Sequence, residues 1–166
     1  TDRFDRIASK VSHQLTKTWL AGYDALRSVN PQFGYRRSDV VLASFPKSGR
    51  NWVRHLIANT MAASAGLDVD IHFRNSAEWV STTLPERPPV DGFPRFVATH
   101  DEYAGQDTRV LYLLRHPADV MESYHHYLKY RWLEDVGEFS DFIQTEEHGI
   151  PAWRRHVESW EDEWDL

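Results

Sequence analysis

Apolar residues recur along the chain in two patterns, one typical of amphipathic helices and one typical of buried strands. Helical spacing predicts a helix over residues 4–27 and another directly after residue 50. Short, continuous apolar runs predict strands at 40–45, 95–100 and 109–115. Strands that alternate with helices favour an α/β layer architecture with a mainly parallel sheet.

The same periodicity predicts which side chains the helices bury. The helix after residue 50 is expected to bury Val53, Leu56, Ile57 and Met61. A helix that begins at Pro117, a residue suited to the first helical position, is expected to bury Val120, Tyr124, Tyr127 and Leu128. The last helix, about 152–165, carries a stripe of Trp153, Val157, Trp160 and Trp164. Because such an apolar stripe rarely stays in water, we expect a partner chain or a dimer contact to cover it.

Composition places the chain among globular proteins. Its 166 residues are 41% hydrophobic and show no repeat or linker, so we expect a single domain over residues 1–166. No apolar run approaches the roughly 20 residues of a membrane helix, and no signal peptide is recognisable. We therefore expect a cytoplasmic protein with no membrane partner. The absence of cysteine excludes disulfides, zinc–thiolate sites and cysteine nucleophiles, and it fits a reducing compartment.

The net charge of −6 is unevenly distributed. Residues 1–139 hold 17 acidic and 17 basic side chains, whereas residues 140–166 hold 8 acidic and 2 basic ones. A nucleic acid would find no overall attraction, so none is expected as a partner. Any anion site must therefore be local.

The stretch FPKSGRNW, residues 45–52, is the candidate for such a site. A strand that ends in a glycine-containing turn and opens a helix presents free backbone amides and a positive helix end. Lys47 adds a full charge, Gly49 lets the backbone approach a phosphate, and Trp52 offers a flat face for a base. An ordinary turn with a surface lysine is the alternative. A Walker A loop would need two glycines before the lysine, which disfavours a phosphotransferase.

The stretch resembles the phosphosulfate loop, P-K-S-G-T-T-W, of sulfotransferases that use 3′-phosphoadenosine 5′-phosphosulfate (PAPS). Pro46, Lys47, Ser48, Gly49 and Trp52 match it, while Arg50 and Asn51 replace the two threonines. RHPADVMESYHH resembles the family's 3′-phosphate motif through Arg115, Pro117, Asp119, Val120, Ser123 and Tyr124. ATHDEY, which contains His100, and the segment FSDFIQ to GIPAWRRHVESW are also similar to family segments. The resemblance runs from about residue 40 to the end.

This resemblance implies a three-layer, P-loop-like α/β fold and a defined role for each matching residue. PAPS would be the co-substrate, 3′-phosphoadenosine 5′-phosphate (PAP) the product, and a hydroxyl of a small molecule or glycan the acceptor, with no metal. Lys47 and His100 would be catalytic, the first at the leaving phosphate and the second as the base. The residues that would bind the nucleotide are Lys47, Ser48, Gly49, Arg50, Asn51, Trp52, Arg115 and Ser123.

Other side chains leave alternatives open. Asp101 and Glu102 could substitute for His100 or support it. A metal site at His116, His125 and His126 is disfavoured, because no further ligands stand at suitable spacing.

Length is the main departure from the family. Family domains continue with a further strand ending in Y-E-D and a late R-K-G-x-x-G-like segment that completes the nucleotide site. The sequence therefore predicts a single domain with an N-terminal helix, 4–27, and a nucleotide-binding core, 40–166, that is short at its C-terminus. A fragment, a naturally short relative and a site completed by another chain remain open. An incomplete or noncatalytic nucleotide-binding module is the alternative function.

Overall fold

The computed structural model describes three stretches of the chain, residues 34–85, 87–132 and 134–161. The chain divides into two compact units, one made of residues 1–35 with 104–106 and the other of residues 36–103 with 107–166. The helices and strands named below all belong to the second unit. The helix predicted over residues 4–27 lies outside the described residues.

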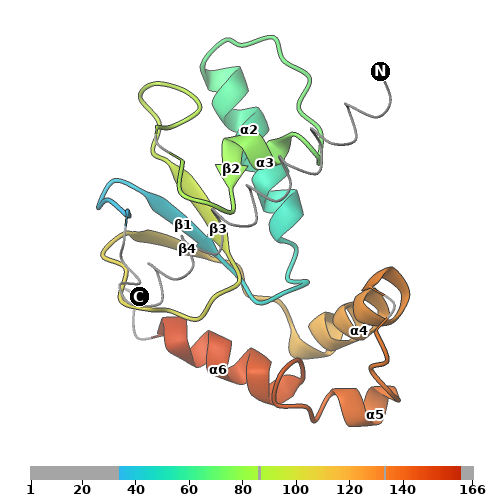
Figure 1. Ribbon diagram of the computed structural model, residues 1–166. Coiled ribbons are helices and arrows are strands. Elements are labelled where there is room, and N and C mark those ends of the chain that lie inside the picture. The colour runs from blue at the N-terminus through green and yellow to red at the C-terminus, as the bar shows by residue number, and fades with distance from the viewer. Residues whose placement is uncertain (1–33, 86, 133, 162–166) are drawn as a thin grey trace, which may run out of the picture. The chain divides into compact units, whose positions relative to one another are not determined.

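A parallel sheet forms the centre of the second unit (Figure 1). Its strands are β1 (Val40–Ala43), β2 (Val80–Ser81), β3 (Phe96–Thr99) and β4 (Arg109–Tyr112), in the spatial order β2-β3-β1-β4. β1 pairs in parallel with both β3 and β4, and β3 pairs in parallel with β2. The predicted parallel sheet and three of its strands are confirmed. β2 was not predicted, because two residues are too few to form a recognisable pattern.

Helices lie on both sides of the sheet (Figure 1). They are α2 (Arg50–Ser64), α3 (Ser76–Trp79), α4 (Pro117–Tyr127), α5 (Phe139–Phe142) and α6 (Ile150–Glu161), and a π-helical turn, η1 (Leu128–Trp132), extends α4. On one face, Val53 and Ile57 of α2 pack against Leu42 of β1. On the other, the ring of Trp160 in α6 lies 6.2 Å from that of Tyr112 in β4. The predicted three-layer arrangement is thus confirmed.

The prediction for the buried face of α2 was partly wrong. Met61 is buried, and Val53 and Ile57 are partly buried, but Leu56 is 61% exposed. Leu56 lies about 200° around the helix from Ala58, which is fully buried, so the two side chains point in opposite directions. The buried face of α2 instead contains an arginine, Arg54.

The prediction of an exposed tryptophan stripe on the last helix was also wrong for Trp160. This side chain is fully buried, and its indole Nε1 donates a hydrogen bond to the carbonyl oxygen of Asp101 at 3.1 Å. Trp153 is partly buried against the core that includes Phe142, and Trp164 lies outside the described residues. Trp160 therefore uses its own chain as the partner surface, and an additional partner remains untested.

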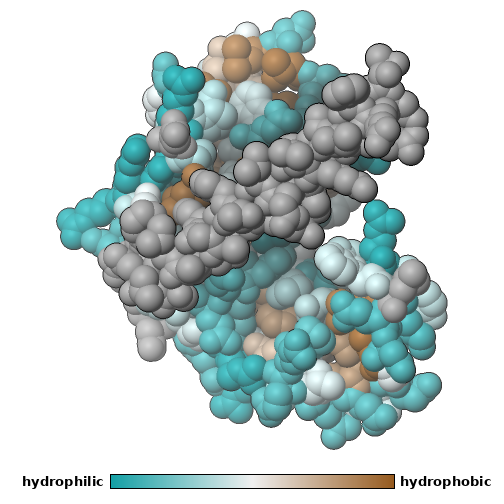
Figure 2. Space-filling model, in the orientation of Figure 1, coloured by the Kyte–Doolittle hydropathy of each residue, from teal (hydrophilic) through white to brown (hydrophobic). Residues whose placement is uncertain are grey.

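On the face shown in Figure 2, the described residues are mainly hydrophilic, with smaller hydrophobic areas among the polar side chains. One hollow of about 740 Å³ lies along α4 and is lined in part by Met121, Phe139, Ile143 and Ile150. Within the part of the chain that the structure describes, no helix has both the length and the apolarity to cross a membrane.

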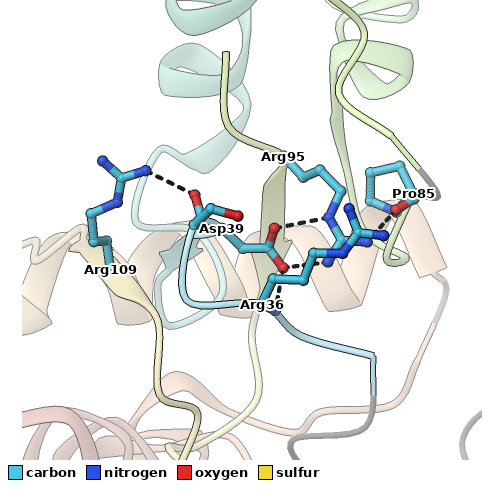
Figure 3. A network of polar contacts seen from close by, with 6 residues as sticks. Arg36, Asp39, Pro85, Arg95 and Arg109 are labelled. Carbon is cyan, nitrogen blue, oxygen red and sulfur yellow. Dashed lines mark hydrogen bonds and ion pairs between the residues drawn. The ribbon is translucent and has the colours of Figure 1, made fainter. Parts of the chain in front are cut away.

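A buried ion pair joins the starts of β1 and β3 (Figure 3). Arg95 donates from Nε to Oδ1 of Asp39 at 2.8 Å, and its second nitrogen pairs with Oδ2 of the same carboxylate. Arg95 also donates to the carbonyl oxygen of Pro85 at 2.6 Å, and the backbone amide of Arg36 donates to Asp39 at 2.8 Å. Because Asp39 is fully buried and Arg95 is nearly so, this network fixes the pairing register at the amino ends of the two strands.

We expect Arg95→Met to destabilise the fold by about 3–5 kcal/mol, because it leaves the Asp39 carboxylate buried without its cation. Replacing both partners, as Asp39→Leu with Arg95→Met, should recover at least half of that loss, since no buried charge is then unpaired. Urea unfolding of the three chains measures the difference. A double variant no more stable than Arg95→Met would contradict this account of the pair.

Candidate active site

The carboxyl ends of three parallel strands meet at one edge of the sheet. The amide of Ser44, just after β1, donates to the carbonyl oxygen of Thr99 in β3 at 3.3 Å. The amide of Leu113, just after β4, donates to the carbonyl oxygen of Ala43 in β1 at 2.8 Å. These bonds hold the loop after β1 beside the segments that follow β3 and β4. Ligands of open parallel sheets bind at this edge.

The loop between β1 and α2 has an unusual backbone conformation. Lys47 has φ of 67° and Gly49 has φ of 103°, both in the left-handed region. A Cβ at Gly49 would come no closer than 3.9 Å to Leu113, so it is the backbone angle rather than space that favours glycine. Gly49 caps α2 without a side-chain hydrogen bond among the described residues, and the first turn contains no acidic residue. The free amides and positive end of α2 are therefore open to an external anion.

Two cationic side chains meet beside this loop. The Lys47 ammonium lies 4.0 Å from the centre of the Tyr127 ring, which comes from the end of α4. Arg115 follows β4 and donates from Nη1 to the carbonyl oxygen of Lys47 at 3.1 Å. Arg115 also lies 3.7 Å from the carboxylate of Asp119 in the first turn of α4. Lys47 and Arg115, which are 68 positions apart in the sequence, thus bring two positive charges to one place.

These residues line two adjoining hollows of about 570 and 640 Å³. Both hollows include Lys47, Arg115, Ser123 and Tyr127. Only the larger one also includes Gly49, Arg50, Asn51, Trp52 and His100. Nearly all the residues expected to bind a nucleotide or to act in catalysis therefore line a continuous cleft.

The other predicted site residue, Ser48, is part of the loop but does not line either hollow. It is buried, and its hydroxyl has no hydrogen-bond partner among the described residues. Trp52 is 65% exposed, and its ring meets the ring of Phe73 edge-on at 4.6 Å. One face of Trp52 is not covered by Phe73 and could stack on a planar ligand.

His100 follows β3 and is held in one tautomer by the backbone. Its Nδ1 lies 2.6 Å from the carbonyl oxygen of Ser44, which can only accept, so Nδ1 carries the proton. Burial and the nearby positive charge of Arg50 lower the pKa of His100 from 6.5 to about 4. His100 is therefore neutral at pH 7, and its Nε2 carries a lone pair. A neutral imidazole with this lone pair can accept a proton.

Sequence reasoning missed a second buried histidine, His156, whose charge would act on His100. His156 in α6 is 2% exposed, and its Nδ1 lies 2.9 Å from the hydroxyl of Tyr112 at the end of β4. Burial lowers the pKa of His156, although the charge of Glu102 and the backbone of His100 and Asp101 act in the opposite direction. The described residues offer Nε2 of His156 no hydrogen bond of normal geometry. Its spacing of four from Trp160 marks a buried helix face, but no pattern indicates what that face contacts.

The described residues contain no cluster of three or more histidine, aspartate or glutamate side chains that could hold a metal. His125 instead points its Nε2 to the carbonyl oxygen of Gly137 at 3.1 Å. His116 caps α4, where its Nδ1 accepts a hydrogen bond from the amide of Ala118 at 3.3 Å. Two of the three histidines of the disfavoured metal hypothesis thus have structural contacts.

Comparison with known proteins gives one family. A family model described as the sulfotransferase domain matches residues 37–166. The parallel sheet flanked by helices is consistent with the P-loop-like fold expected from the resemblance to sulfotransferases.

Among individual proteins, the chain is 28% identical to a luciferin sulfotransferase of Photinus pyralis over 159 residues, which covers 75% of this chain and 43% of that protein. It is 29% identical to sulfotransferase 2B1 of Rattus norvegicus, over 75% of this chain and 41% of that protein. It is 24% identical to human sulfotransferase 2A1, over 82% of this chain and 53% of that protein. The chain spans about half the length of these relatives.

The lowered pKa of His100 predicts how stability depends on pH. The unfolded chain takes up this proton near pH 6.5, but the folded chain does so only near pH 4. Neutral His100 therefore contributes fully to the free energy of unfolding above pH 6.5. This contribution is lost as the pH falls toward 4, by about 3 kcal/mol in total. His100→Asn keeps an amide donor for Ser44 but does not titrate, so its stability should fall less over this range. Urea unfolding at a series of pH values measures this, with His126→Asn at an exposed position as the control. If the free energy of unfolding fell equally with pH in His100→Asn and in the unmodified chain, the lowered pKa of His100 would be contradicted.

Proposed function

The chain belongs to the sulfotransferase domain family, and on this premise we propose that it transfers the sulfuryl group of PAPS to a hydroxyl of a small-molecule or glycan acceptor. The observation that carries the proposal is the convergence of Lys47, His100, Arg115 and Ser123 around one cleft. They come from three separate segments, each of which matches the family in sequence. Because the chain spans about half of its relatives, its activity is part of the proposal.

The residues of the cleft fit the chemistry of a phosphosulfate anion. The N-terminus of α2 has no side-chain cap among the described residues, and the Ser48 hydroxyl is buried beside it with no partner there. Lys47 supplies a charge at the same loop. The 5′-phosphate of such a ligand would satisfy the free amides and balance the positive helix end. PAPS, when bound, supplies an activated sulfuryl group on such a phosphate.

Donor and acceptor require different residues in this mechanism. Lys47 stabilises the negative charge that develops on the leaving phosphate oxygen, while the first amides of α2 hold the 5′-phosphate. Arg115 and Ser123 bind the 3′-phosphate, one through charge-assisted hydrogen bonds and the other through its hydroxyl. These two residues would distinguish this nucleotide from an ordinary adenylate.

His100 acts on the acceptor. The acceptor oxygen forms a new bond to sulfur, the bond from sulfur to the bridging oxygen breaks, and Nε2 of His100 takes the acceptor proton. Nδ1 keeps its own proton and donates it in the hydrogen bond to the carbonyl oxygen of Ser44, which fixes the direction of the ring. A bound anion beside His100 raises the pKa of the imidazole, because it favours the charged form. His100 is therefore a weak base in the free protein and becomes a stronger one in the complex.

An incomplete or noncatalytic nucleotide-binding module is the second candidate function. The observation that favours it is length, since the chain spans 43% of the luciferin sulfotransferase and 41% of sulfotransferase 2B1. Calorimetry with PAP, followed by sulfate transfer from labelled PAPS to a panel of hydroxyl acceptors, separates the two candidates. Binding without transfer to any acceptor would favour the module.

We expect Lys47→Ala to lower sulfate transfer by about a hundredfold or more, the usual scale for losing one group that stabilises developing charge. Transfer from labelled PAPS is the measurement, and circular dichroism checks that the variant folds. Lys129→Ala, which removes an exposed lysine outside the cleft, is the control and should transfer normally. An unchanged rate in folded Lys47→Ala would rule out the leaving-group role.

The second expectation concerns the nucleotide. The chain should bind PAP about ten- to a hundredfold more tightly than adenosine 5′-phosphate, because the 3′-phosphate gains charged hydrogen bonds from Arg115. Arg115→Ala should remove most of this preference, and Ser123→Ala a smaller part. Calorimetry with both nucleotides measures the ratio, and binding of adenosine 5′-phosphate reports any disturbance of the loop that Arg115 contacts. Equal affinity of the unmodified chain for the two nucleotides would contradict the 3′-phosphate site.

A further inference from the structure

Two arginines lie one turn apart on the same side of α2, at the end nearest the cleft. Arg54 is only 8% exposed, and Arg50 lines the larger hollow. Within the part of the chain that the structure describes, Nε of Arg50 and both Nε and Nη2 of Arg54 are buried without a hydrogen-bond partner. The resemblance to the sulfotransferase loop does not account for Arg50, since the loop has threonine at this position.

The positive charges of the two guanidinium groups repel each other. Burial, and next the charge of Arg54, lower the pKa of Arg50 to about 10, and burial also lowers the pKa of Arg54. The carboxylate of Asp101 acts on Arg50 in the opposite direction but does not offset these effects. Unpaired buried charges are strongly destabilising, so a second anion beside them would be stabilising.

The side chain of Arg50, a residue that the resemblance assigns to the nucleotide, lies near the proposed base, His100. The smaller hollow contains three of the residues assigned to the donor, Lys47, Arg115 and Ser123, and contains neither Arg50 nor His100. Arg50 joins them only in the larger hollow, where it is close enough to His100 to lower the pKa of the imidazole. Arg54 is one turn further along α2 from the anion-binding helix end. The positive charge of Arg50 and Arg54 thus lies on the side of the proposed base, His100, and not on the side of the residues assigned to the 3′-phosphate.

We propose that the acceptor is a hydroxylated aromatic acid, whose anionic group pairs with Arg50 and Arg54 while its hydroxyl faces His100. The proposal rests on the function proposed above and adds the class of acceptor. Trp132 also lines the larger hollow and is 63% exposed, so it offers an aromatic surface to the ring of such a substrate. Arg50 binds the anionic group directly, and Arg54 adds a second charge from behind it.

Three phenols of similar size and different charge test this proposal. They are 4-hydroxyphenylacetate, an anion; 4-hydroxyphenylacetamide, its neutral analogue; and tyramine, a cation. Each is titrated by calorimetry into the chain saturated with PAP, so that binding is measured without any transfer. The acetate should bind at least about tenfold more tightly than the amide, as expected for a charged hydrogen-bonded pair, and tyramine should bind most weakly. An amide that binds as tightly as the acetate, or an acetate with no measurable binding, would overturn the proposal.

Variants test whether Arg54 causes the preference for the acetate over the amide. Arg54→Met should reduce the acetate-to-amide ratio below about threefold and leave the affinity for PAP nearly unchanged, because the donor residues lie elsewhere. Arg154→Met, which removes an exposed arginine of α6 paired with Glu158, should leave the ratio unchanged. Arg54→Met should also melt at no lower temperature than the unmodified chain, since it removes an unpaired buried charge. A loss of PAP affinity parallel to the loss of discrimination, or a clear fall in melting temperature, would show that Arg54 serves the donor or the fold, and would overturn the proposal.

Transfer from labelled PAPS is then measured with the same three phenols. Tight, selective binding of the acetate without its sulfation would support the acceptor site and contradict the sulfotransferase function. Sulfation of all three phenols with similar kcat/KM would support the function and overturn the acceptor site. The two proposals can therefore fail separately.

Discussion

The candidate site depends on the parallel pairing of β1 with β3 and β4, because this pairing brings three distant segments to one edge of the sheet. Val40 is in register with both Phe96 and Arg109, so the three strands also end at the same level, at Ala43, Thr99 and Tyr112. The loop between β1 and α2, His100 and Arg115 follow these ends. The buried pair of Asp39 and Arg95 fixes the register from the opposite end of two of the strands. A slip of one residue would move His100 away from the carbonyl oxygen of Ser44.

Positive charge accumulates at this edge of a chain whose net charge is −6. Lys47, Arg50 and Arg115 line the larger hollow, and Arg54 lies one turn along α2 from Arg50. The acidic excess is in residues 140–166. Any attraction of this site for an anion therefore comes from its local arrangement rather than from the net charge of the chain. The same arrangement keeps His100 neutral and makes its basicity depend on which anions are bound.

The sequence predicted much of the fold and singled out many of the residues that line the cleft, for identifiable reasons. Continuous apolar runs are characteristic of strands buried on both faces, and β1 and β3 are of this kind. The motifs around Lys47 and Arg115 lie directly after strands, so their placement at one edge follows from a parallel sheet. The short elements β2, α3 and α5 were missed because none has enough residues to show a period. Leu56 was misassigned because apolarity alone does not show which side of a helix faces the sheet.

By itself, the sequence determined the α/β class, the position of the loop between β1 and α2, and the family, because these depend on residue types at fixed spacing within continuous segments. Only the tertiary structure decided which side chains are buried without hydrogen-bond partners among the described residues. It also decided which side chains from distant segments interact. Trp160 was expected to need another chain, but it reaches the carbonyl oxygen of Asp101 in its own. His156 contacts Tyr112, which is 44 positions away, and Arg50 lowers the pKa of His100, which is 50 positions away. No pattern within either segment encodes these interactions. Burial and electrostatic balance are properties of the packed chain, because they depend on neighbours that are far apart in the sequence.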